Sequence, residues 1–213
     1  MTELLSFAAT VFVGFFAIMN PIANTPIFLG LTHGIEPAEK RKIAIQSNFL
    51  AFVIVSLFCL LGHVIFSLFG ITLPAFRIAG GILVFLIGKD MLSGNNSELH
   101  TPSVEDNQRS LDHPHVSIAI SPLAVPILGG PGTIATAMNF ATGKGIPEVI
   151  ICITVFGVLC GISCLFFLSG ERFLHYIGES AVKVISRMMG LILAVIGTQL
   201  VIQGVYGASK LNL

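Results

Sequence analysis

Charged side chains are scarce in this chain. Asp, Glu, Lys and Arg make up 10% of the 213 residues, whereas hydrophobic residues make up 54%. Soluble domains carry about 25% charged residues, so the composition excludes an ordinary soluble domain and indicates an integral membrane protein. The formal net charge is zero, which removes the electrostatic basis for binding nucleic acid. No basic region precedes the first apolar run, so we expect this run to be an uncleaved membrane span.

Side chains that carry chemistry are not clustered. The four cysteines lie in apolar runs and form no CxxC pair, which favours small buried hydrophobic residues over a redox or metal site. No acidic residue lies in the middle of an apolar run, so we expect no carboxylate proton carrier. The sequence also has no nucleophile paired with a base, no Walker loop and no set of metal ligands. We therefore predict no enzymatic activity, no catalytic residues, no metal site and no cofactor.

Six apolar runs are long enough to cross a bilayer, which takes about 20 residues per helix. They cover roughly residues 4–31, 43–70, 74–92, 116–142, 146–169 and 181–206. The polar residues 93–115 separate them into two sets of three, and their composition is typical of a flexible connector. The sequence thus predicts an all-α membrane protein of six transmembrane helices. One three-helix unit spans residues 1–92, the connector spans 93–115, and a second unit spans 116–213.

The two units share motifs at matching positions. Two prolines five residues apart interrupt the first and fourth runs, and two glycines seven residues apart recur in the third and sixth. The matched pairs are Pro21 with Pro126, Pro26 with Pro131, Gly81 with Gly190, and Gly88 with Gly197. Because each unit has an odd number of spans, the second enters the membrane from the opposite side, so the repeats are predicted to be inverted. The glycines predict close helix packing.

The proline pairs predict that helices 1 and 4 are broken near the bilayer midplane. Proline removes a backbone donor and clashes with the preceding turn, and bare backbone is tolerated in a membrane only where it faces protein or a watery cavity. We expect residues 20–25 and 125–131 to be non-helical, with Pro26 and Pro131 at first helical positions. The N–H groups and positive dipole end of each following half-helix would bind an anion. Broken helices in both halves typically mark a transporter's central site.

The candidate substrate site combines these two breaks with two arginines. Arg77 and Arg187 each lie near the start of an apolar helix, where a cation opposes the helix dipole. An anionic ligand would compensate for this, and an interfacial anchor is the alternative. The substrate-binding residues predicted from the sequence are Asn20, Pro21, Asn24, Thr25, Pro26, Arg77, Pro126, Gly129, Gly130, Pro131, Gly132, Thr133 and Arg187. Asn48 and His63 are expected to form interhelical hydrogen bonds rather than substrate contacts.

The distribution of lysine and arginine predicts the orientation in the membrane. On the side of the connector lie eight such residues: Lys40, Arg41, Lys42, Lys89, Arg109, Arg172, Lys183 and Arg187. On the other side lie three: Arg77, Lys144 and Lys210. Residues 93–115 are therefore expected in the cytoplasm and both termini outside.

The sequence resembles the MarC family over nearly its whole length. The motifs that carry the resemblance are Asn20-Pro21, Pro26-Ile27-Phe28, Arg77-Ile78-Ala79-Gly80-Gly81, Pro122-Leu123-Ala124-Val125-Pro126, Gly130-Pro131-Gly132-Thr133-Ile134, and Ser186-Arg187 with Met189-Gly190. Gly129 stands where the family more often has alanine. The family is also described as small neutral amino acid transporters, and some members are described as carrying glycine and alanine. The resemblance implies a multi-pass protein of a bacterial-type inner membrane.

The expected function is a carrier for small neutral amino acids of the glycine and alanine class, whose carboxylate would bind the half-helix N–H groups. A translocase for a lipid-linked phosphate such as polyprenyl phosphate is the alternative, because two arginines suit a phosphate. A channel is disfavoured, because no ring of like charge lines a path. A non-transporting membrane partner and a homo-oligomer stay open as alternatives. The expected partners are this small-molecule or lipid-phosphate substrate and membrane lipids.

Overall fold

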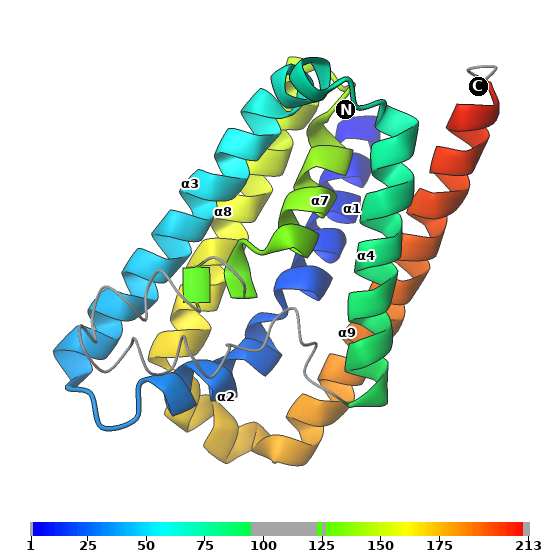
Figure 1. The fold of residues 1–213 in the computed structure, drawn as a ribbon. Coiled ribbons are helices and arrows are strands. Elements are labelled where there is room, and N and C mark those ends of the chain that lie inside the picture. Colours follow the sequence, from blue (N-terminus) through cyan, green and yellow to red (C-terminus); the bar gives the residue numbers. More distant parts are fainter. Residues whose placement is uncertain (1, 95–122, 125–126, 211–213) are drawn as a thin grey trace.

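A computed structural model of the chain describes residues 2–94, 123–124 and 127–210 (Figure 1). The described residues form helices and no strand. In chain order the helices are α1 (Thr2–Met19), α2 (Pro21–Leu31), α3 (Pro37–Phe69), α4 (Leu73–Ser93), α7 (Pro131–Ala141), α8 (Ile146–Leu168) and α9 (Gly170–Ser209). The prediction of an all-helical protein is confirmed. Most of the predicted connector, the start of the fourth apolar run and Pro126 lie outside the described residues.

Four helical segments are long and apolar enough to cross a membrane: Thr2–Leu31, Pro37–Gly62, Ile146–Leu168 and Ser180–Ser209. α4 has 21 residues and is therefore about 31 Å long, but it carries three charged residues. Large apolar side chains face outward on these segments, among them Leu60, which is 61% exposed, and Leu165, which is 67% exposed. An apolar exterior of this kind suits lipid rather than water.

α4 and α9 pack against each other through glycines. A Cβ atom placed on Gly81 would lie 2.7 Å from the carbonyl oxygen of Gly197, and one on Gly88 would lie 2.6 Å from that of Gly190. The reverse contacts are equally close, because a Cβ on Gly197 would lie 2.6 Å from the Gly81 oxygen. The earlier glycine of α4 contacts the later glycine of α9, and the later one contacts the earlier one, so the two helices are antiparallel. The close packing predicted for these glycines is confirmed.

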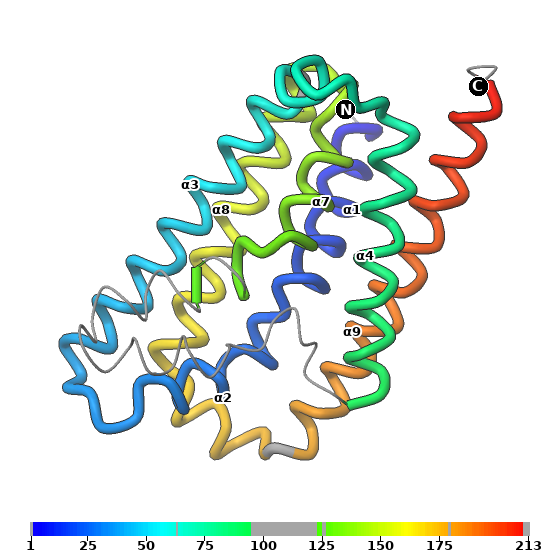
Figure 2. Tube along the Cα trace, viewed as in Figure 1, coloured from blue at the N-terminus to red at the C-terminus, as the bar shows by residue number. Residues whose placement is uncertain are grey.

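The other helices form a layer beside this pair. α3 packs along α8, while α1 contacts α7, α8 and α9. α1 begins and α9 ends at the same end of the bundle, whereas α7 begins inside it (Figures 1 and 2). Phe15 of α1 is fully buried and lies 5.0 Å from Phe156 of α8 between ring centroids. The aromatic and aliphatic core thus lies between α1, α7 and α8.

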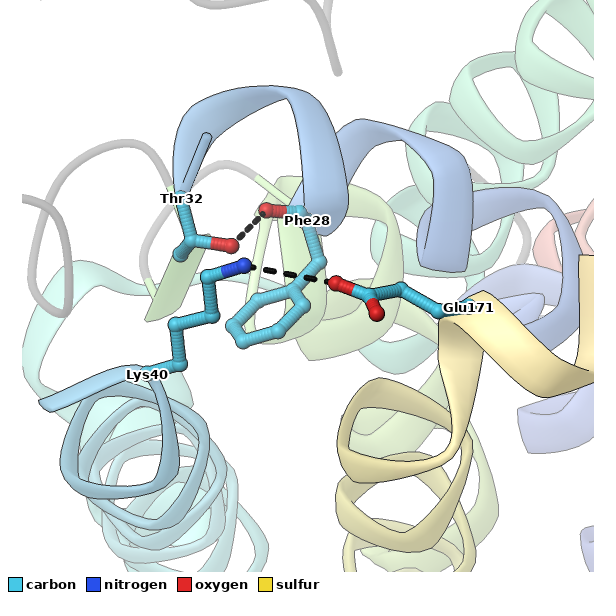
Figure 3. A network of polar contacts seen from close by, with 4 residues as sticks. All are labelled: Phe28, Thr32, Lys40 and Glu171. Carbon is cyan, nitrogen blue, oxygen red and sulfur yellow. Dashed lines mark hydrogen bonds and ion pairs between the residues drawn. The ribbon is translucent and has the colours of Figure 1, made fainter. Parts of the chain in front are cut away.

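α2 closes the end of the bundle away from the termini. The ring of Phe28 stacks on Phe167 of α8, with centroids 4.5 Å apart and planes 2° apart. The Thr32 hydroxyl donates to the Phe28 carbonyl at 2.8 Å, and beside it Lys40 Nζ lies 3.4 Å from Glu171 Oε1 (Figure 3). Glu171 is 77% exposed, so this ion pair contributes little stability. The aromatic stack is the stronger link between α2 and α8.

Candidate functional site

The first apolar run is broken at a single residue. Asn20 has φ 35° and ψ 66°, in the left-handed region, and separates α1 from α2. The predicted non-helical stretch, residues 20–25, is therefore too long, since Pro21 to Thr25 are helical, and Pro26 lies inside α2 rather than at its start. The reason is that Pro21 itself occupies the first helical position, where its missing N–H costs nothing. The helix can therefore resume immediately after Asn20.

At the first break, polar side chains form hydrogen bonds with backbone groups of the same segment. Asn20 Oδ1 accepts a hydrogen bond from the Ala23 N–H at 3.3 Å, and Asn24 Nδ2 donates to the Met19 carbonyl at 2.7 Å. The Thr25 hydroxyl donates to the Pro21 carbonyl at 2.8 Å. The predicted substrate-binding residues Asn20, Asn24 and Thr25 are thus engaged within their own segment. The Ala17 carbonyl lacks its helical donor, because that donor would be the absent N–H of Pro21.

α7, which follows the second break, begins with an uncapped N-terminus. Pro131 lies in the first turn as predicted, and the capping residue Gly130 makes no side-chain cap bond. Ile134 N–H donates to the Gly130 carbonyl at 2.9 Å. Pro131 has no N–H, so the N–H groups of Gly132 and Thr133 are left without an acceptor in the helix. The sequence predicted an anion at this helix end, and these two N–H groups are the donors that would hold it.

The predicted non-helical stretch of residues 125–131 is also too long. Residues 127 and 128 form a π-helical turn and Pro131 is helical, which leaves Gly129 and Gly130 as the non-helical described residues. Val125 and Pro126 lie outside the described residues. A Cβ on Gly129 would lie 3.4 Å from the Cα of Ala51 on α3. The glycines therefore let the break pack closely against α3.

Two threonines in the first half of α7 have hydroxyls that find no hydrogen-bond partner among the described residues. Thr133 is 0% exposed and Thr136 is 1% exposed, and both Oγ1 atoms are unpaired. Residues three apart share one face of a helix, so both hydroxyls lie on the same side of α7. A buried polar atom left unpaired costs about 1–3 kcal/mol. Sequence reasoning missed Thr136, although its spacing from Thr133 on a half-helix was a usable signal.

Asn48 of α3 contributes a third unpaired atom. It is 4% exposed, and its Nδ2 donates to the Ala44 carbonyl at 2.9 Å. Its Oδ1 has no partner in the part of the chain that the structure describes. The prediction that Asn48 bonds to another helix is wrong for its amide nitrogen, because the acceptor, Ala44, belongs to the same helix. Asn48 lies one turn before Ala51, the residue that packs on Gly129. A free acceptor therefore lies near the second break.

The start of α7 lies beside the end of α1. A Cβ on Gly132 would lie 2.9 Å from Ile18 Cδ1 and 2.6 Å from Ile87 Cδ1. A Cβ on Gly14 would lie 2.9 Å from the Phe140 ring, so α1 and α7 are antiparallel. The positive end of the α7 dipole and the negative end of the α1 dipole are consequently neighbours. A ligand here meets donors on one side and carbonyl oxygens on the other.

The two arginines lie at opposite ends of the α4–α9 pair. Arg77 Nε donates to Asn139 Oδ1 of α7 at 3.1 Å. Arg187 is exposed, and its Nη2 lies 3.0 Å from the position of a Cβ on Gly94, the residue that caps α4. The 17 residues between Arg77 and Gly94 correspond to about 25 Å of helix. The structure therefore does not bring Arg77 and Arg187 to one ligand, and Asn139 is a partner that sequence reasoning missed.

Comparison with known proteins places these features in a family. The sequence profile described as "MarC family integral membrane protein" matches residues 5–209. The UPF0056 membrane protein YvbG of Bacillus subtilis is 38% identical over 203 residues, which cover 95% of each chain. A UPF0056 membrane protein of Pyrococcus abyssi is 37% identical over 98% of each chain. The UPF0056 inner membrane protein MarC of Citrobacter koseri is 30% identical over 88% of this chain and 89% of its own. No solved structure matches the chain.

Proposed function

The chain belongs to the MarC family of integral membrane proteins, and we propose that it is a carrier for small neutral amino acids of the glycine and alanine class. The observation that carries this proposal is the pair of buried, unpaired hydroxyls of Thr133 and Thr136 at the uncapped start of α7. Polar groups inside a membrane protein are expensive and typically serve function. A solute that pairs them would recover the cost of leaving them empty.

A zwitterion suits this arrangement at both of its charged ends. Its carboxylate would accept from the N–H groups of Gly132 and Thr133, where the helix dipole favours an anion. Its ammonium group would donate to the carbonyl end of α1, where the Ala17 oxygen lacks its helical donor. Ile18 and Ile87 approach Gly132 closely, which disfavours a substrate with a large side chain. The proposed substrate is therefore a glycine-sized or alanine-sized amino acid.

The proposal includes the six-helix inverted repeat. Gly81 contacts Gly197, and Gly190 contacts Gly88. If each glycine is exchanged for its counterpart in the other unit, the first contact becomes the second. A two-fold axis through the α4–α9 interface has this property. Such repeats commonly bind substrate between broken helices of the two halves. We further propose the orientation given by the charge bias, with both termini outside and no enzymatic activity.

A lipid-phosphate translocase remains the second candidate because of where the arginines lie. Arg77 and Arg187 occupy opposite ends of the bundle, so each could hold a phosphate headgroup at its own membrane face. Arginine binds phosphate through paired, charge-assisted hydrogen bonds. In this case the two arginines would matter equally, and the threonines would not.

Equilibrium binding to the purified protein in lipid nanodiscs separates the two candidates. We expect radiolabelled alanine to bind the wild type, and Thr133→Val to weaken binding about tenfold or more, because a hydrogen bond to a charged group contributes about 1.5–3 kcal/mol. Arg187→Ala should leave alanine binding unchanged. Binding of polyprenyl phosphate that falls equally in Arg77→Ala and Arg187→Ala, with no alanine binding, would establish the translocase instead.

A further inference from the structure

A cavity of about 490 Å³ opens at the end of the bundle where α1 begins. Five residues of α1 and one of α7 line it: Thr2, Glu3, Ser6, Phe7, Thr10 and Phe140. Its volume lies within the range of about 300–1,000 Å³ that is usual for small-molecule sites. The lining offers one carboxylate, three hydroxyls and two aromatic rings. These polar groups are set in a lining that is mainly apolar.

Opposite charges flank the cavity. Glu3 takes part in no ion pair among the described residues. Lys144, in the turn after α7, places its Nζ 5.8 Å from the centroid of the Phe7 ring. A carboxylate, an ammonium group and an aromatic face together attract a molecule that carries both charges. A zwitterion can thus place its ammonium group on Glu3 and its carboxylate toward Lys144.

Along α7, Phe140 lies between the cavity and the buried hydroxyls. It lines the cavity, and it lies one helical turn after Thr136. Its ring meets Phe7 edge-on at 6.3 Å and Phe15 at 5.9 Å, and it lies where a Cβ on Gly14 would be 2.9 Å away. Gly14 allows the ring to lie flat against α1. Phe140 is therefore the cavity residue of α7 that lies nearest in sequence to Thr136.

We propose that this cavity is an outer binding site for the zwitterionic solute, with Glu3 as the ligand of its ammonium group and Phe140 as the barrier to the inner site. The inference rests on the proposed function and adds a second site to it. The solute would bind first at the outer site and reach Thr136 and Thr133 when the Phe140 ring moves aside. A small amino acid fits a passage that one side chain can close.

Cysteine protection tests the outer site. In a background free of the four native cysteines, Thr10→Cys should react with a water-soluble maleimide, and alanine should slow the reaction. Adding Glu3→Gln should raise the alanine concentration for half-protection at least tenfold. Glu148→Gln is the matched control, because Glu148 also lies in the first turn of a helix but does not line the cavity. Equal protection in both variants would overturn the role of Glu3.

A buried reporter tests the barrier. Ala137 is 0% exposed and lies three residues before Phe140, so Ala137→Cys should react slowly. Adding Phe140→Ala should speed its labelling at least tenfold, whereas Phe140→Leu, which keeps the bulk, should not. Phe12→Ala is the control, because Phe12 stacks on Phe16 and lines no part of the cavity. Labelling that is independent of Phe140 would overturn the barrier.

The two proposals fail in different ways. Alanine that binds the wild type and is lost in Thr133→Val, but that does not protect Thr10→Cys, overturns the outer site and leaves the carrier intact. Absence of alanine binding by both assays overturns the proposed function and the outer site together. Protection of Thr10→Cys that is lost with Glu3→Gln supports both.

Discussion

Thr133→Val should stabilise the empty protein while it weakens ligand binding. Valine replaces the unpaired hydroxyl with a methyl group of the same shape. Since an unpaired buried polar group costs about 1–3 kcal/mol, the free energy of unfolding without ligand should rise by about this amount. In a chain of this size 1 kcal/mol corresponds to about 2–4 °C in Tm. The expected increase in Tm is therefore about 2–12 °C.

The assay is thermal unfolding in detergent with and without alanine. A ligand at 100 times its Kd stabilises a protein by about 2.7 kcal/mol, so the wild type should gain from alanine and Thr133→Val should gain far less. Thr198→Val is the control, because Thr198 is exposed and its hydroxyl donates to the Ala194 carbonyl at 2.8 Å. It should change stability by about 0.5 kcal/mol or less. A lower Tm for ligand-free Thr133→Val would refute the reasoning, because it would mean that the hydroxyl is paired.

Three further predictions concern the fold. Gly88→Ala should lower the free energy of unfolding by about 1–3 kcal/mol, because the methyl group would overpack against the α9 backbone. Gly161 has open space around it, so Gly161→Ala should stabilise its helix by about 0.5–1 kcal/mol. Urea unfolding in mixed micelles measures both changes. Asn20→Ala should destabilise the protein by about 2–3 kcal/mol, because alanine is strained in the left-handed conformation and cannot cap α2. Asn20→Gly should destabilise it less, and equal losses for the two variants in the same measurement would contradict a backbone cause. Arg77→Ala and Asn139→Ala should lower Tm by similar amounts, and the double variant by less than their sum, because the two side chains share one hydrogen bond.

The sequence predicted the helices because hydrocarbon leaves the backbone few alternatives. A run of apolar residues must satisfy its own N–H and C=O groups in a membrane, so long runs indicate helices whatever their packing. The close helix packing could also be predicted, because Gly81 and Gly88 have no side chain and lie seven residues apart on one helix. The position of Pro131 in the first turn of α7 followed from the chemistry of proline alone.

The breaks were harder to place because one residue can make the whole turn. Asn20 adopts a left-handed conformation and caps α2 with its own side chain, which shortened a predicted six-residue loop to one position. The sequence also gave no sign that Asn24 would bond back to Met19 rather than await a ligand. Such choices depend on local geometry that residue identity does not determine.

Tertiary partners could not be derived from spacing. Arg77 meets Asn139 across 62 positions of sequence, and this contact exists only because α4 and α7 pack together. The separation of Arg77 from Arg187 likewise follows from the antiparallel course of α4 and α9. Their matching motifs indicated a shared role, but the structure places the two arginines at opposite ends of the α4–α9 pair.

The glycine contacts between α4 and α9 also bear on biosynthesis. The Gly81 and Gly88 face of α4 is complementary to Gly190 and Gly197, which lie in the segment that the ribosome makes last. Until some hundred further residues have been translated, this bare backbone of α4 lacks the partner that it packs against in the folded protein. The packing of α4 is therefore complete only after α9 has been translated. A chain truncated before α9 would leave the Gly81 and Gly88 face of α4 without its partner.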